Sequence, residues 1–147
     1  ECSMLKIDFG SGYNPYPGYK TCDITQGPYL DYVYNTETNE IIGLQEGSVD
    51  EFRLKNVLHH ADIPKVIQCL HRYLKSGGIL QIIEPRTEYY EQNRCLDLFW
   101  YRYIYPRYEI AIPPKRRVDY LKICEAYFKI SSHQNADVYD VYFFVNR

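Results

Sequence analysis

The sequence predicts a single α/β domain in which the strands form a central, mostly parallel sheet. An apolar run at residues 4–7 stops at two closely spaced glycines, which is typical of a short buried strand that ends in a sharp turn. Residues 62–75 have the apolar spacing of an amphipathic helix, and residues 78–83 are nearly all apolar, as in a strand covered on both faces. The chain has 147 residues, enough for one domain with a sizeable core, which we place over residues 1–147.

The first strand and its turn give the strongest functional signal. The turn is DFGSG at residues 8–12, and its two glycines let the backbone lie close to a ligand. A second short strand at residues 19–22 ends at Asp23, and an acid in that place can accept two hydrogen bonds from the vicinal hydroxyls of a ribose. This layout predicts a nucleoside-binding site. The alternative is an ordinary strand–turn–strand of an α/β protein.

A dinucleotide is disfavoured as the ligand. The dinucleotide fingerprint needs a third glycine and a helix whose N-terminus faces a pyrophosphate. Here residues 13–18 (YNPYPG) contain two prolines, which leave no room for a long helix before Asp23. A ligand without phosphates, such as S-adenosylmethionine (SAM), does not require that helix. A nicotinamide-dependent oxidoreductase therefore stays as a weaker alternative.

The middle of the chain contains two further predicted strands. Residues 31–34 form a third strand that ends near Asn35, and residues 49–54 form a fourth. Residues 36–48 are polar with a short apolar patch, which predicts a turn of helix or a loop. These two strands extend the sheet that begins with the two strands on either side of the glycine turn.

A helix with clear terminal signals follows. Asp62 is its N-cap, Pro64 lies in its first turn, and Gly77 is its C-cap. The helix leads directly into the apolar strand at residues 78–83. Strand, helix and strand in this order predict a parallel pair joined by a crossover helix.

The C-terminal part contains two further helices and a hairpin. Apolar residues crowd the middle of residues 88–105, where we expect a helix, and a second helix is expected over residues 115–126. Residues 127–133 and 138–145 are two extended runs close in sequence, which predicts an antiparallel hairpin.

Composition excludes several classes of function. The net charge of −2 argues against a general polyanion binder, and no apolar run approaches the roughly 20 residues of a membrane span, so no membrane partner is expected. The five cysteines are scattered without the paired spacing of a zinc site, and we predict no metal. Reduced, mostly buried thiols in a cytoplasmic protein are expected.

Residues 86–117 differ in character from the rest. They hold seven basic and four acidic side chains, interleaved with many of the aromatic residues. Such a segment can cover an acceptor, with its arginines pairing with carboxylate or phosphate. It can equally be a structural cap or an oligomer face.

The order of elements and several motifs resemble class I SAM-dependent methyltransferases. Within that superfamily the chain is similar to a compact group of predicted methyltransferases in which Asn-Pro follows the glycine turn. The resemblance is strong over residues 4–86 and rests on topology alone over residues 115–147. The matching motifs are IDFGSGYNP at residues 7–15, PGY at 17–19, CDI at 22–24, VDEF at 49–52, VLHH at 57–60 and LKSGG at 74–78.

The resemblance implies a Rossmann-like, doubly wound sheet of order 3-2-1-4-5-7-6 with strand 7 antiparallel. It places SAM at the carboxyl ends of strands one, two and four. The glycines would face the methionine part, Asp23 the ribose and Asn35 the adenine, while residues 55–59 would line the methyl-transfer side. The cofactor-binding residues it implies are Asp8, Gly10, Ser11, Gly12, Asp23, Ile24, Asn35, Lys55 and Asn56.

The resemblance also leaves alternatives for the mechanism and the acceptor. His59 and His60 lie at the methyl-transfer edge, where either could act as a base if the acceptor must lose a proton; otherwise one caps the next helix and the other packs. Glu84 is an alternative polar contact. The Asn/Asp-Pro-Pro-Tyr signature of amino-group DNA methyltransferases is absent from the sequence, so a small molecule or a glycan is favoured over DNA as the unidentified acceptor.

Two expectations concern activity and assembly. The chain is expected to be an active methyltransferase, with a catalytically inactive SAM-fold binding or scaffolding module as the alternative. In relatives, helices before strand one often cover the SAM site, and we expect them to be missing here because the sequence begins just before strand one. We therefore expect a large acceptor, a homodimer or a partner subunit to cover the site.

Overall fold

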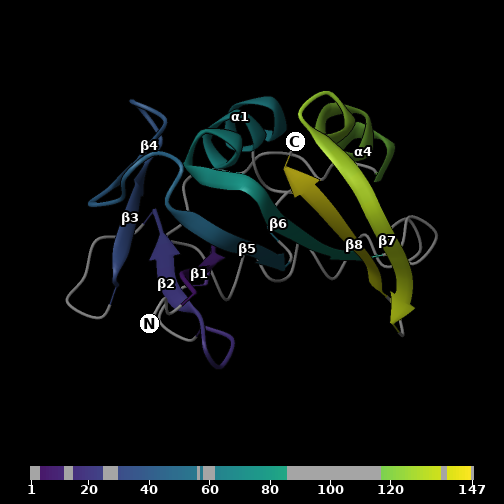
Figure 1. Ribbon diagram of the computed structural model, residues 1–147, viewed down its shortest axis with the longest axis horizontal. Coiled ribbons are helices and arrows are strands. Elements are labelled where there is room, and N and C mark those ends of the chain that lie inside the picture. Colours follow the sequence, from purple (N-terminus) through teal and green to yellow (C-terminus); the bar gives the residue numbers. More distant parts are fainter. Residues whose placement is uncertain are drawn as a thin grey trace, which may run out of the picture.

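The computed structural model describes residues 4–11, 15–24, 30–55, 57, 62–85, 117–136 and 139–146. Within these residues the strands form one sheet, and two helices pack against it (Figure 1). The elements in chain order are β1 Lys6–Phe9, β2 Lys20–Asp23, β3 Tyr32–Asn35, β4 Glu40–Ile42, β5 Val49–Lys55, α1 Ile63–Tyr73, β6 Leu74–Pro85, α4 Arg117–Glu125, β7 Phe128–Ala136 and β8 Tyr139–Asn146.

The sheet is mixed and has the order β4-β3-β2-β1-β5-β6-β8-β7. Strands β1, β2, β3, β5 and β6 pair in parallel, and β8 lies antiparallel between β6 and β7. This order differs from the predicted one because β4 adds a strand beyond β3, where a turn of helix or a loop was expected. Without β4, the neighbours follow the predicted sequence of strands.

Strand β4 forms because the chain reverses tightly on both sides of it. Asn39 has a positive φ of 57° just before the strand, and Gly43 has a φ of 87° just after it. Such left-handed positions favour Asn and Gly and allow a hairpin to close over a few residues. Three residues of β4 then pair antiparallel with β3.

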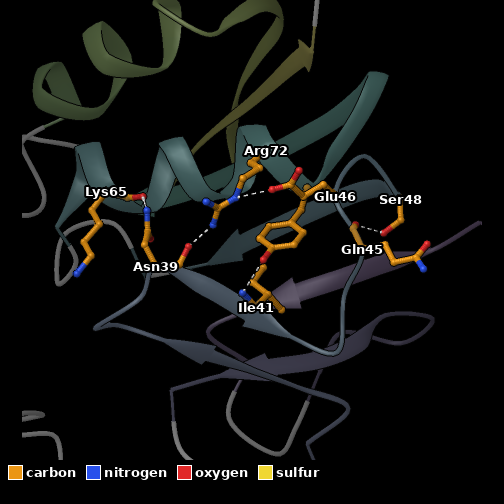
Figure 2. Close-up of polar contacts among 8 residues, drawn as sticks. Asn39, Ile41, Gln45, Glu46, Ser48, Lys65 and Arg72 are labelled. Atoms are coloured by element: carbon orange, nitrogen blue, oxygen red, sulfur yellow. Dashed lines mark hydrogen bonds and ion pairs between the residues drawn. The ribbon is translucent and has the colours of Figure 1, made fainter.

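The hairpin of β3 and β4 is tied to helix α1 by side chains from the helix (Figure 2). The guanidinium of Arg72 donates to the backbone oxygen of Asn39 and lies 3.5 Å from Glu46, while the Asn39 amide donates to the backbone oxygen of Lys65 at 3.0 Å. The hydroxyl of Tyr73 accepts a hydrogen bond from the backbone N–H of Ile41 at 3.2 Å. These contacts fix the outer edge of the sheet on the helix.

Helix α1 begins as predicted and ends earlier than predicted. Asp62 is the N-cap, and its side chain accepts from the backbone N–H of Lys65. The predicted C-cap at Gly77 is wrong, because Leu74 is already extended, with φ −77° and ψ 136°. Leu74 pairs with Val49 as the first residue of β6, so sheet pairing takes over directly after the helix.

The two faces of the central strands differ in chemistry. Successive residues of a strand point to opposite faces. Ile7 of β1 pairs in register with Phe52 of β5, and both are fully buried on one apolar face. The next pair, Asp8 and Arg53, lies on the other face, which is therefore polar at the centre of the sheet.

Both helices of the described residues cover the apolar face, and Figure 1 shows them side by side. His71 of α1 has its ring 5.6 Å from that of Phe128, and Tyr120 of α4 has its ring 6.3 Å from that of Tyr142. Neither helix is long and apolar enough to cross a membrane. The core of the described part thus lies between the sheet and these two helices.

The C-terminal predictions have mixed outcomes. Helix α4 forms within the predicted range of residues 115–126, and β7 and β8 form the predicted antiparallel hairpin. The helix expected over residues 88–105 and nearly all of the segment 86–117 lie outside the described residues. Among the described cysteines, Cys22, Cys69 and Cys124 are free and buried, and burial raises the pKa of the Cys69 thiol to about 11.

Candidate cofactor site

The carboxyl ends of the five parallel strands meet at one edge of the sheet, and most of the predicted cofactor residues lie there. The structure describes seven of them at or near the ends of β1, β2, β3 and β5: Asp8, Gly10, Ser11, Asp23, Ile24, Asn35 and Lys55. The other predicted site residues, Gly12, Asn56, His59 and His60, lie outside the described residues. The edge is thus built from segments far apart in sequence.

The glycine turn is locked to the second strand. Gly10 has a φ of 80°, and its backbone N–H donates to the backbone oxygen of Cys22 at 2.7 Å. Ser11 makes two contacts with the same residue: its N–H donates to Cys22 O at 3.3 Å, and its Oγ accepts from Cys22 N at 3.3 Å. A Cβ at position 10 would lie 2.5 Å from a methyl group of Val57, so only glycine fits this turn.

Asp23 directly follows Cys22, whose backbone is hydrogen-bonded to the glycine turn. Its Oδ1 accepts a hydrogen bond from the backbone N–H of Ile24 at 2.7 Å, which orients the carboxylate at the end of β2. Asp23 is half-buried, and Ile24 packs against the core. An oriented, partly exposed carboxylate next to a glycine turn has the chemistry needed to accept hydrogen bonds from ribose hydroxyls.

Asn35 is the last residue of β3, and its side chain stabilises the turn that follows. Its Oδ1 accepts from the backbone N–H of Glu37 at 2.9 Å and from that of Thr38 at 3.3 Å. This is the local side-chain-to-backbone pattern by which Asn starts a turn. The residue stands at the edge where an adenine contact was predicted, and its side-chain oxygen shapes the turn into β4.

Asp8 is a buried acid just before the glycine turn. Its Oδ2 accepts from the backbone N–H of Tyr16 at 2.8 Å and lies 3.7 Å from the guanidinium of Arg53. Burial raises the pKa of Asp8 above its ordinary value, and the nearby charge of Asp23 adds to this; the Tyr16 hydrogen bond, Arg53 and Lys55 act in the opposite direction. The site therefore holds an acid whose negative charge is disfavoured by its surroundings.

Arg53 and Tyr16 were missed by the sequence analysis. The guanidinium carbon of Arg53 lies 4.2 Å from the centre of the Tyr16 ring, and only 9% of Arg53 is exposed. A signal was present, since a charged residue inside a central strand needs a partner, and Asp8 is the acid inside the first strand. The pairing follows from the register of β1 with β5, which the sequence does not give.

The edge continues past the cofactor side to β6 and β8. Lys55 is exposed at the end of β5, with its ammonium 5.3 Å from the centre of the Tyr139 ring. Glu84 is buried near the end of β6, opposite Asp140 in β8, and Asp140 Oδ1 lies 3.0 Å from the Nε2 of His133. These ionisable groups lie near the ends of β5, β6 and their neighbours, at the same edge of the sheet as the glycine turn. The described residues include no group of three or more His, Cys, Asp or Glu placed to hold a metal.

The local chemistry fits a nucleoside-containing ligand. The turn at Gly10 carries no side chain that could cover its backbone, and Asp23 supplies an oriented acceptor. Residues 15–19 follow the turn as a tight bend, with the N–H of Tyr19 donating to Tyr16 O at 3.0 Å. In the described part of this connection, therefore, no helix N-terminus faces the turn.

Comparison with known proteins finds solved structures of similar fold, whereas the two comparisons of the sequence find no match. No known protein family matches the sequence. No curated protein matches it either.

Solved structures with the same fold share little sequence with this chain. A SAM-dependent methyltransferase from Mesorhizobium loti has a TM-score of 0.67 at 12% identity, covering 97% of this chain and 91% of that one. A chain from a Haloferax volcanii complex of a methyltransferase activator with a proposed methyltransferase has a TM-score of 0.66 at 12% identity, covering 99% and 83%. Geranyl diphosphate C-methyltransferase from Streptomyces coelicolor, solved with S-adenosyl-L-homocysteine, has a TM-score of 0.61 at 12% identity, covering 99% and 70%. The fold is that of the class I SAM-dependent methyltransferases.

Proposed function

We propose that this protein is a SAM-dependent methyltransferase that acts on a small molecule or a glycan. The observation that carries the proposal is the locked glycine turn: Gly10 and Ser11 are hydrogen-bonded to Cys22, so that Asp23 lies beside the turn at the carboxyl edge. The same edge is the ligand side of open α/β sheets in general. The shared fold with SAM-dependent methyltransferases supports the choice of ligand.

In this proposal, five of the cofactor residues border different parts of SAM. Asp23 accepts the hydrogen bonds of the ribose, and the backbone at Gly10 and Ser11 borders the methionine part. Ile24 and Asn35 border the adenine from the ends of β2 and β3. Bound SAM supplies a methyl group on a sulfonium, which is already a good leaving group. The main task of the protein's own residues is therefore to align the acceptor and to exclude water.

A base is needed only if the acceptor must lose a proton. We propose His59 or His60 for that role, from the segment that follows β5. Glu84 is the alternative, because it lies near the end of the next strand, β6. Lys55, exposed beside Tyr139, can attract an anionic group on the acceptor.

A covering partner is part of the proposal. The Haloferax volcanii complex contains a methyltransferase activator, so a chain with this fold is found together with another subunit. We propose that a second copy or a partner subunit covers the carboxyl edge here. Sedimentation of the purified protein with and without ligand measures whether a second copy takes this place.

Calorimetric titration tests the proposal. SAM and S-adenosyl-L-homocysteine should bind to the purified protein, and NAD should not, because the connection after the glycine turn is a bend with two prolines. Binding of NAD with no binding of SAM would overturn the choice of ligand. A screen of methyl transfer to sugars, small acids and RNA then separates an active enzyme from an inactive binding module.

A further inference from the structure

A buried arginine and a short loop cover the polar face of the sheet beside the glycine turn. Arg53 places its guanidinium carbon 4.2 Å from the centre of the Tyr16 ring and its Nη1 3.7 Å from Asp8 Oδ2. The same carboxylate oxygen accepts the backbone N–H of Tyr16 at 2.8 Å. Asp8, Tyr16 and Arg53 thus form a closed set of contacts, which we call the Arg53 clasp.

A second cation–aromatic contact extends the clasp along the loop. Tyr16 and Tyr19 meet edge to face with ring centres 5.7 Å apart, and the ammonium of Lys6 lies 5.6 Å from the centre of the Tyr19 ring. Residues 15–19 are therefore held on the central strands by two basic side chains. In the usual doubly wound sheet a crossover helix covers this face.

The clasp is costly for the fold alone. Asp8 is 5% exposed and Arg53 is 9% exposed, and burying two charges costs desolvation energy that a salt bridge with a 3.7 Å separation repays poorly. The neighbouring pair in the same register, Ile7 and Phe52, is apolar and fully buried, so apolar packing is available between these strands. Asp8 also precedes Gly10 by two residues, so contacts that hold the Asp8 carboxylate also restrain the start of the turn.

We propose that Arg53 is a positioning residue for the nucleoside site: through Asp8 and Tyr16 it fixes the glycine turn and the loop 15–19 in the arrangement that the ligand needs. This inference rests on the proposed function, and it names a residue and a loop that the function itself does not require. Arg53 acts through the two residues it holds.

The first test compares ligand affinity in Arg53 variants. Calorimetry with S-adenosyl-L-homocysteine should show binding to Arg53→Gln weakened about threefold to thirtyfold, the range expected for a residue that modulates a neighbouring site. Arg53→Lys should lie between, because its ammonium stays charged beside Asp8 but lacks the planar group that stacks on Tyr16. The matched control is Lys75→Gln, which removes a second ion pair of β5, with Asp50 at 3.1 Å. The control should bind like the wild type.

The pH dependence of affinity separates positioning from plain stability. Asp8 faces Arg53 and Lys55 from β5, Asp23 from β2 and the N–H of Tyr16 from the loop. Removing the Arg53 charge raises the pKa of Asp8 further, so the affinity of Arg53→Gln should fall more steeply than that of the wild type as the pH is lowered from neutral. A purely structural role would lower the unfolding temperature and leave this slope unchanged.

The outcomes distinguish the inference from the proposed function. If the wild type binds no S-adenosyl-L-homocysteine, the proposed function fails. If the wild type binds it and Arg53→Gln has the same affinity and the same slope, the positioning role of Arg53 is wrong. Should Arg53→Gln not fold, Tyr16→Leu replaces it as the test, because Tyr16 is 52% exposed and its loss spares the core. Its affinity should fall at least threefold, and an unchanged affinity would overturn the inference.

Discussion

Two aspartates lie on the neighbouring strands β1 and β5, near opposite ends of these strands. They differ in how their charge affects the stability of the fold. Asp50, at the amino end of β5, accepts from the backbone N–H of Leu5 at 2.7 Å and lies 3.1 Å from the ammonium of Lys75. The Leu5 hydrogen bond, helped by Lys75, lowers the pKa of Asp50 below its ordinary value of 3.8. Asp8, near the carboxyl edge, has its pKa raised by burial.

The two aspartates contribute to stability with opposite dependence on pH. The charge of Asp50 stabilises the fold above the ordinary carboxyl pKa, and this contribution is lost as the pH falls through the lowered native pKa. For Asp8 the sign is reversed, since the folded state favours the neutral acid. Its favourable contribution is complete below pH 3.8 and is lost as the pH rises through the raised native pKa. A charge held against the stability of the fold is typical of functional sites.

The largest effect on binding is expected at Asp23. Replacing it by Ala removes the proposed charge-assisted hydrogen bonds to the ribose, which are expected to be worth roughly 1.5–3 kcal/mol, or about tenfold to over a hundredfold in SAM affinity. Calorimetry at neutral pH measures the loss. Full SAM affinity in Asp23→Ala would rule out its contact with the ribose.

The glycine turn should be the next most sensitive place. Gly10→Ala forces a side chain into the left-handed region and against Val57, where a Cβ would lie 2.5 Å from a methyl group. Gly18→Ala is the matched control, because Gly18 has a φ of 90° with open space around its Cβ position. The control should lose about 1–2 kcal/mol in the free energy of unfolding, and Gly10→Ala more. Equal losses in denaturant titrations would show that the contact with Val57 is unimportant.

A smaller effect, confined to stability, is expected at Asp50. Asp50→Asn weakens the hydrogen bond to Leu5 and the ion pair to Lys75, and the free energy of unfolding should fall by about 1–2 kcal/mol at neutral pH, a range reduced for the half-exposed lysine. The difference from the wild type should shrink as the pH falls below 3.8. Denaturant titrations at several pH values check this, and a difference that grows toward acid pH would contradict it.

The sequence predicted the positions of the glycine turn and of Asp23, which depend on local signals. The glycine turn and Asp23 lie within a few residues of the strands that place them, so spacing alone brings them to one edge. Arg53 was missed because its contact with Asp8 depends on the register between strands 45 residues apart. A residue paired only through tertiary register leaves little trace in a single sequence.

The errors in the fold have a similar cause. Strand β4 has three residues, too few for an alternating pattern, and Arg72 and Tyr73 of α1 hold its hairpin in place. Gly77 was taken as the helix end because glycine often follows a helix, whereas Leu74 pairs with β5 first. In both places contacts between distant segments override the local preference.

One paired measurement tests the central claim most directly, that the carboxyl edge is the ligand site and the amino end only supports the fold. Asp8→Asn and Asp50→Asn are compared with the wild type at neutral pH, by denaturant unfolding and by calorimetry with S-adenosyl-L-homocysteine. Asp8→Asn should be less stable, because it leaves the buried guanidinium of Arg53 without its carboxylate, and it should bind more weakly; Asp50→Asn should be less stable and bind equally well. Unchanged affinity in Asp8→Asn, or weakened affinity in Asp50→Asn, would contradict the account.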